Sequence, residues 1–111
     1  MDLGIAPHAP GVAVVHPHGR LDLLAAQDVK TRLTETVAAG HQRLVVDLTD
    51  VPFIDSSGLG ALIGGLKAAR QAGGDLRIAR PGEQPRTVLQ LTTLDRVLRP
   101  YATVEEALAG L

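Results

Sequence analysis

The chain has 111 residues, the size of one ordinary domain, and 45% of them are hydrophobic, which is enough for a core. Only 2% are aromatic and the net charge is −1, so the chain lacks both rings that stack on bases and a basic surface for phosphates, which argues against nucleic acid as a partner. The absence of cysteine excludes disulfides and thiolate metal sites. The sequence shows no signal-peptide pattern and no apolar run long enough to span a bilayer, so we expect a cytoplasmic protein without a signal peptide or a membrane partner.

The first part of the chain contains prolines within apparent strands. Residues 1–10 are either a weak edge strand or disordered, because Pro7 and Pro10 interrupt a regular strand over 3–6. A strand is predicted over 11–19 from its β-branched valines, with Pro17 at a strand end or an edge.

A helix is predicted next, with Asp22 as its N-cap and Gly40 as its end. Its apolar residues recur at helical intervals: Leu24, Val29, Leu33 and Val37. The segment 43–51 then contains a continuous apolar run that is typical of a strand covered on both faces.

The later elements alternate in the same way. They are predicted as a short extended stretch at 53–54, a helix over 56–71, a strand over 76–80, a loop over 81–85, a helix over 86–91, a turn and brief strand within 92–98, and a helix over 103–108 that opens with a capping box of Thr103 and Glu106. Alternating strands and helices with short links predict one α/β domain over residues 1–111, with a mixed, mostly parallel sheet of four to five strands and about four helices.

The helix over 56–71 is unusually rich in glycine, with four glycines among the eight residues from Gly58 to Gly65. Each costs about 1 kcal/mol relative to alanine, so we expect a compensating role. A helical wheel puts four large residues on the face predicted to pack on the sheet: Leu59, Leu62, Ile63 and Leu66. The opposite face is predicted to carry only small residues: Gly60, Ala61, Gly64, Gly65, Ala68 and Ala72. Either another part of the domain packs closely on this face, or another protein docks there.

The helix begins at Asp55, Ser56 and Ser57. Capping of free N–H groups alone would explain Asp55 or Ser57. Two hydroxyls and a carboxylate exceed what one cap needs, however, and a helix N-terminus also tolerates a phosphate. A phosphate would add about −2 charge beside the small-residue face, so the chemistry of a phosphorylation switch is present.

Motifs of other chemistries do not match. A hydrolase elbow needs glycine two residues before the serine, where Ile54 and Asp55 stand. A dinucleotide loop needs a third glycine at Ile63, and no Walker sequence occurs. An enzyme interpretation, a small nucleotide hydrolase that uses Ser56, therefore lacks a base and an oxyanion motif.

Two histidines and two pairs of polar residues are assigned no role. His16 and His18 could share one face of a strand, but without a third ligand nearby we interpret them as solvated, and no metal site is predicted. Helix-start and turn roles account for the remaining pairs, Glu105 with Glu106 and Thr92 with Thr93.

Several segments, in order, resemble the STAS domains of bacterial anti-sigma factor antagonists: GRLD (19–22), RLVVDLTDVPFIDSSGLG (43–60), FIDSSGLGALIGGLKAARQAGGDLRIA (53–79) and LQLTTLDRVLRPYATVEEAL (89–108). The resemblance implies a protein without catalysis or cofactor that binds an anti-sigma factor, itself a serine kinase of the histidine-kinase-like ATPase type, and so frees a sigma factor. It also implies that the kinase phosphorylates the antagonist on one serine and that a phosphatase reverses this. Pro17 departs from the family's regular first strand.

The resemblance also implies roles for individual residues. Ser56 corresponds to the phosphorylated serine, and Asp22, Asp55 and Ser57 to its neighbours. A partner-binding surface is expected at Gly58, Leu59, Gly60, Ala61 and Gly64. The alternative within the same family is an unphosphorylated scaffold of a signalling complex, or a soluble subunit of a lipid or anion transporter.

Overall fold

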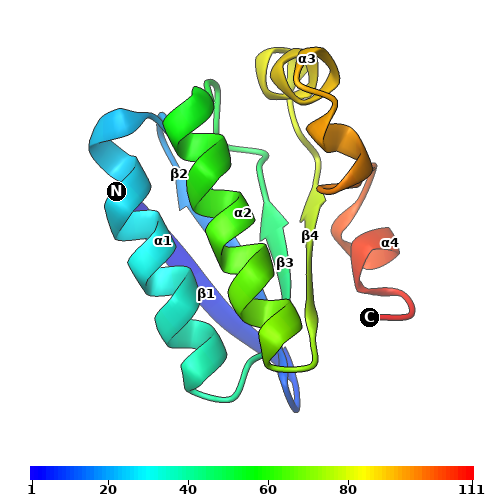
Figure 1. The fold of residues 1–111 in the computed structure, drawn as a ribbon. Coiled ribbons are helices and arrows are strands. Elements are labelled where there is room, and N and C mark those ends of the chain that lie inside the picture. The colour runs from blue at the N-terminus through cyan, green and yellow to red at the C-terminus, as the bar shows by residue number, and fades with distance from the viewer.

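The computed structural model describes all 111 residues and contains one five-stranded sheet (Figure 1). The strands lie in the order in which they occur in the chain: β1 (Asp2–Ala9), β2 (Val12–His18), β3 (Arg43–Asp47), β4 (Asp75–Ala79) and β5 (Pro100–Tyr101). β1 is antiparallel to β2, and all later neighbours are parallel. The predicted mixed, mostly parallel sheet is therefore confirmed.

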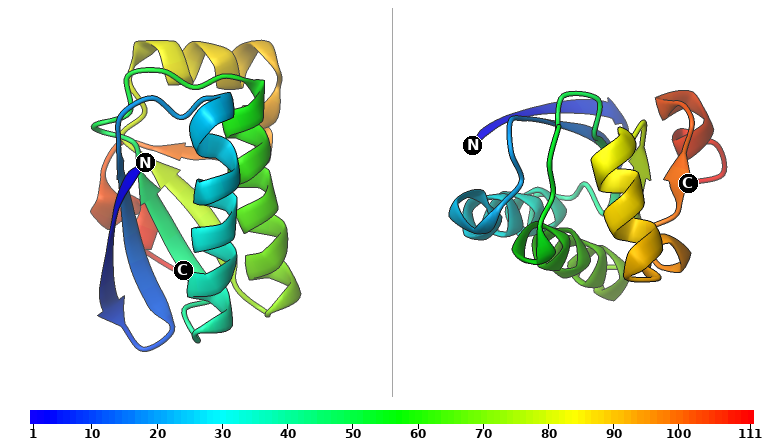
Figure 2. Two further views of the ribbon diagram at one scale, coloured as in Figure 1. Left: turned by 90° about the vertical axis from the view of Figure 1, so that its left-hand side faces the viewer. Right: turned by 90° about the horizontal axis from the view of Figure 1, so that it is seen from above.

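Two long helices, α1 (Leu23–Ala38) and α2 (Ser56–Gln71), cover one face of the sheet (Figures 1 and 2). They share that face because successive right-handed crossovers run in one direction across the sheet. The main core of 22 buried residues lies between these helices and the sheet. Both the predicted bounds of α2 and Asp22 as the N-cap of α1 are confirmed.

The opposite face of the sheet is covered only in part. α4 (Val104–Leu108) packs there over a small cluster made by Val45, Ala79 and Ala107. Its predicted cap is confirmed, since the Thr103 hydroxyl accepts a hydrogen bond from the Glu106 backbone N–H at 3.0 Å. The part of this face beside β2 carries polar side chains instead.

The N-terminal residues form a full edge strand, β1, which settles the alternative left open for residues 1–10. The pairing register shifts between Pro7 and Ala9, so Pro7 lies beside an irregularity. Pro17 lies within β2, but the pairing of β2 with β3 ends at Val15. The missing N–H of Pro17 therefore falls where β2 has no partner strand on the β3 side.

The apolar run within 43–51 forms β3, which ends at Asp47. Two predicted boundaries are wrong. α3 (Glu83–Leu91) begins three residues early and includes Pro85, which is tolerated because first-turn N–H groups have no partner within the helix. The segment predicted as a turn and strand holds a 3₁₀ turn at Leu94–Arg96, and the strand follows at β5.

The prediction of an exposed small-residue face on α2 is wrong for the middle of the helix. Ala61 and Gly65 are buried, and Gly64 is half-buried. A Cβ at Gly65 would lie 2.7 Å from Cδ1 of Leu33, and one at Gly64 would lie 2.9 Å from Cε of Lys30. The small residues therefore let α1 pack closely against α2, which is the first of the two interpretations.

Candidate functional site

The N-termini of α1 and α2 lie side by side at one end of the sheet (Figure 1). The segments that lead into them are paired: the Leu21 N–H donates to the Phe53 carbonyl at 2.9 Å, and the Asp55 N–H donates to the Leu21 carbonyl at 3.3 Å. A parallel bridge between Leu21 and Ile54 accompanies these bonds. The two helices therefore begin from one fixed platform.

Two carboxylates cap these helices. Oδ1 of Asp22 accepts from the backbone N–H groups of Leu24 and Ala25 at 3.1 and 3.3 Å. Asp55 caps its own helix, with Oδ1 2.8 Å from the Gly58 nitrogen, and its Oδ2 accepts from the Leu23 N–H of the other helix at 3.0 Å. Asp55 thus joins the two helix starts.

The serines take no part in this capping. Ser56 is exposed and Ser57 half-buried, and neither hydroxyl makes a hydrogen bond to another group of the protein. Because the Asp55 carboxylate is the cap of this helix, capping does not account for either hydroxyl. The Ser56 hydroxyl is free and faces solvent.

Most residues predicted to contact a partner are buried or half-buried in the domain. Gly58 and Leu59 are buried, and a Cβ at Gly58 would collide with the Leu21 carbonyl. Ala61 is 4% exposed, and the half-buried Gly64 lies against Lys30. Among these residues only Gly60 is exposed, with no atom within 4 Å of a Cβ built there.

Sequence reasoning missed an apolar pair beside the serine. Leu23 and Leu24, at the start of α1, are 72% and 92% exposed. Leu24 was expected to face inward, yet the buried stripe of α1 runs through Ala25, Val29 and Leu33. Successive residues are rotated by about 100° around the axis of a helix, so the Leu24 side chain points about 100° away from that of the buried Ala25. A helical wheel that places Ala25 in the core therefore places Leu24 outside the buried stripe.

One cation belongs to this corner. The Nε atom of Arg20 lies 3.7 Å from Oδ2 of Asp22, and its guanidinium lies 4.0 Å from the centre of the Phe53 ring. Arg20 therefore offsets part of the charge of Asp22, and Asp55 has no cationic side-chain partner of its own.

Comparison with known proteins identifies the family of this chain. A family model described as "STAS domain" matches residues 5–107. The chain belongs to the STAS domain family. This STAS domain is 34% identical over 101 residues to the anti-sigma-F factor antagonist RsfB of Mycobacterium tuberculosis, covering 91% of this chain and 82% of RsfB. It is 28% identical over 105 residues to an anti-sigma F factor antagonist of Paenibacillus polymyxa, covering 94% and 90%.

Solved structures show the same fold. The crystal structure of an anti-sigma factor antagonist from Mycobacterium paratuberculosis matches with a TM-score of 0.84 and 29% identity, covering 96% of this chain and 90% of that one. SpoIIAA, solved in unphosphorylated and phosphorylated forms, matches with TM-scores of 0.71 and 0.73. At 22% and 21% identity, that similarity shows the fold alone. None of the helices of this STAS domain has the length and hydropathy that a bilayer span requires.

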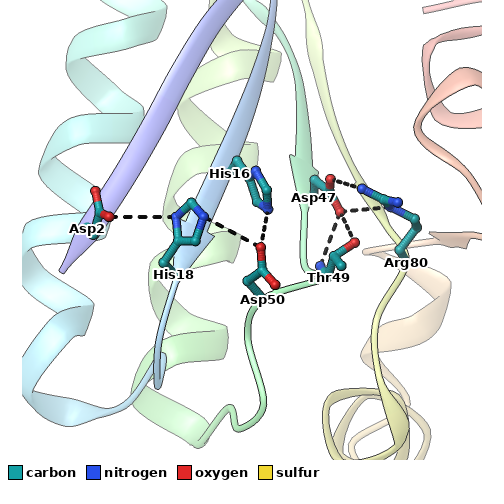
Figure 3. Close-up of polar contacts among 7 residues, drawn as sticks. All are labelled: Asp2, His16, His18, Asp47, Thr49, Asp50 and Arg80. Atoms are coloured by element: carbon teal, nitrogen blue, oxygen red, sulfur yellow. Dashed lines mark hydrogen bonds and ion pairs between the residues drawn. The ribbon is translucent and has the colours of Figure 1, made fainter.

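An ion pair joins the buried Asp47 carboxylate to the exposed Arg80 side chain (Figure 3). The Asp47 carboxylate accepts from Nε and Nη2 of Arg80 at 3.2 and 2.5 Å and from the backbone and hydroxyl of Thr49. Burial raises the pKa of Asp47, but the hydrogen bonds from Arg80 and Thr49 and the charge of Arg80 outweigh it, so the net pKa lies below its ordinary value. These hydrogen bonds also raise the pKa of Arg80. Sequence analysis did not identify the pair.

The structure brings a third polar residue to the two histidines. Asp50, in the turn after β3, lies beside His16 and His18 (Figure 3). The expectation that no third ligand is nearby is therefore wrong.

Proposed function

We propose that this STAS domain is an anti-sigma factor antagonist that is switched off by phosphorylation of Ser56. In this role it binds an anti-sigma factor that is a serine kinase of the histidine-kinase-like ATPase type, and so releases a sigma factor. The observation that carries the proposal is the free, exposed Ser56 hydroxyl at a helix start that carboxylates already cap. The names of the relatives support it.

The phosphoryl transfer requires no catalysis by this chain. The Ser56 oxygen bonds to the γ-phosphorus of ATP, the bond to the β-phosphate oxygen breaks and ADP leaves, while the hydroxyl proton passes to the kinase or to water. A serine phosphatase then hydrolyses the phosphoserine. The helix N-terminus accommodates the phosphate because its dipole favours negative charge there.

Charge and bulk explain how the phosphate would act. It adds about −2 charge next to the carboxylates of Asp22 and Asp55, where Arg20 is the cation in contact. The added group therefore repels an acidic surface and obstructs close contact. A tenfold loss of affinity needs only about 1.4 kcal/mol.

The proposed docking surface consists of Leu23, Leu24, Ser56 and Gly60. The leucines supply exposed apolar area, and Gly60 leaves room for close approach. Burying one leucine side chain contributes about 1.5–3 kcal/mol, so two can anchor a partner. This surface replaces the predicted one that included Ala61 and Gly64.

The first experiment measures intact mass after incubation with Mg-ATP and each anti-sigma kinase encoded in the same genome. We expect one added phosphoryl group on the wild-type protein and none on Ser56→Ala. Ser57→Ala is the matched control and should still gain one group. Modification that persists in Ser56→Ala would refute the assignment of the serine, and no modification with any kinase would refute the switch.

The second experiment tests the docking surface by titration calorimetry with the kinase that modifies Ser56. Leu24→Asp should lower affinity at least tenfold, because it removes an apolar anchor and adds a carboxylate. Leu91→Asp, which changes a leucine that is 80% exposed on another helix, should bind like the wild type. Equal losses in both variants would contradict the proposed surface.

A further inference from the structure

The cluster of His16, His18 and Asp50 has the donor atoms and spacing of a metal site (Figure 3). The histidines alternate along β2 and so project from the same face of the sheet. Their ring centroids are 4.4 Å apart. One carboxylate oxygen, Oδ2 of Asp50, lies 2.9 Å from Nε2 of His16 and 3.5 Å from Nε2 of His18.

We propose that these three side chains bind one divalent transition-metal ion of the Zn²⁺ class. Two imidazole nitrogens and one carboxylate oxygen are ligands that zinc takes in proteins, usually with a fourth position open to water or another ligand. An ion bound tetrahedrally at about 2.1 Å from two ligand atoms holds them about 3.4 Å apart. The separations of 2.9 and 3.5 Å lie on either side of that value, and all three donor atoms lie within 4.8 Å of one another.

The donor atoms make close ion-pair contacts with one another but no aligned hydrogen bond. Nε2 of His16 is buried and has no hydrogen-bond partner, since its approach to Asp50 is close but not aligned as a hydrogen bond. The Asp50 carboxylate likewise accepts no aligned hydrogen bond from the protein. A buried polar atom without a partner costs about 1–3 kcal/mol, and a metal ion would remove that cost.

The scaffold holds the ligands in place. β2 is fixed by pairing with β1, in which His16 is opposite Gly4 and His18 opposite Asp2. The Asp50 carbonyl accepts from the Gly19 N–H at 3.0 Å, which ties the turn after β3 to the end of β2. Asp50 is 32 residues from His18 in sequence, and the parallel pairing of β2 with β3 brings them together.

The surroundings also suit a cation. Asp2 lies 3.9 Å from Nδ1 of His18, on the ring side away from Asp50, where an outer carboxylate commonly orients a metal-bound histidine. The nearby cation, Arg80, is held by two hydrogen bonds to Asp47. The three ligand side chains are 36–49% exposed, so an ion has access from solvent.

This site is separate from the proposed switch, although the segments that follow His18 and Asp50 lead into the caps of α1 and α2. The chain runs from His18 to Asp22 in four residues and from Asp50 to Asp55 in five. A bound metal would therefore clamp together the two segments that begin the helices.

Titration of the full chain with Zn²⁺ alone, after removal of any purification tag, tests the proposal. Calorimetry should give one saturable ion per chain, and the melting temperature should rise with added Zn²⁺. His18→Gln and Asp50→Asn should each weaken binding at least tenfold. The matched control changes the other two histidines together, His8→Gln with His41→Gln, and should bind like the wild type.

Nitrogen-15 NMR of the histidine rings keeps the test independent of how the variants fold. In the wild-type protein, Zn²⁺ should shift the Nε2 signals of His16 and His18 and leave those of His8 and His41 unchanged. Absence of saturable binding, or equal loss of binding in the control variant, would overturn the proposal.

Discussion

Small residues have opposite roles in the N-terminal part of α2, at Ser56 and Gly60, and in the middle of the same helix, at Gly64 and Gly65. In the middle, Gly64 and Gly65 carry no side chain because Lys30 and Leu33 of α1 occupy that space. Near the N-terminal end, Ser56 and Gly60 are exposed to solvent and contact no other part of the domain. The small residues of α2 therefore do not share one role, and only the exposed residues near its N-terminus remain candidates for function.

The largest expected loss of stability is at Gly58, which is buried, unlike the exposed Ser56 and Gly60 near it. Gly58→Ala should lower the free energy of unfolding by roughly 3 kcal/mol, because its Cβ would meet the backbone carbonyl of Leu21, which cannot move without breaking the platform. Urea denaturation measures the change. A variant as stable as the wild type would show that the platform is flexible and would remove the reason for glycine there.

The buried carboxylate of Asp47 is expected to contribute more to stability than the exposed N-terminal end of α2. Asp47→Asn should cost about 2 kcal/mol at neutral pH, because hydrogen bonds to a charged group are lost. The folded-state pKa of Asp47 lies below the unfolded value of about 3.9, so its contribution is complete above that pH and is lost as the pH falls through the folded-state pKa. Denaturation at pH 7 and pH 3 should therefore show a gap between wild type and variant that narrows in acid. A gap independent of pH would contradict this account.

A matched pair of alanine substitutions tests the contrast within α2 most directly. Gly65→Ala should destabilise the domain by about 1 kcal/mol, since strain against Leu33 and Leu76 exceeds the gain in helix propensity. Gly60→Ala should stabilise it by up to about 1 kcal/mol, because the helix gains and nothing lies within 4 Å of the new atom. Thermal unfolding of both variants decides the matter, and effects of the same sign would abolish the distinction between the two regions.

The smallest effect on stability is expected at the residue proposed to matter most for function. Ser56→Ala should change the free energy of unfolding by less than about 0.5 kcal/mol, since its hydroxyl bonds to no other group. Chemical denaturation beside Ser57→Ala provides the measurement. A loss above 1 kcal/mol would mean that the hydroxyl has a structural role after all.

Local signals in the sequence identified most of the architecture. The bounds of α2, the cap at Asp22 and the cap at Thr103 depend on neighbouring residues, so they were predictable. The predicted start of α3 is too late, because the prediction ends the preceding loop at a proline. Pro85 lies instead in the first turn of α3, where its missing N–H costs no hydrogen bond.

The unpredicted features depend on contacts between distant segments. A helical wheel places Gly65 on one side of α2, but only the position of α1 determines that this side is covered. The pairings of Asp47 with Arg80 and of Asp50 with the histidines likewise depend on neighbouring parallel strands. A parallel sheet predicts that strand ends meet at one edge, so Asp50 near His18 was within reach of sequence reasoning.

The order of strands in the sheet, which repeats their order in the chain, bears on how the protein is made. Each strand from β2 onward pairs with the strand synthesised just before it. Domains begin to fold from the N-terminus during translation, and contacts between segments close in sequence form fastest. A nascent chain can therefore form this sheet by adding one strand at a time. No strand made early has to stay unpaired until a strand from the end of the chain has been synthesised.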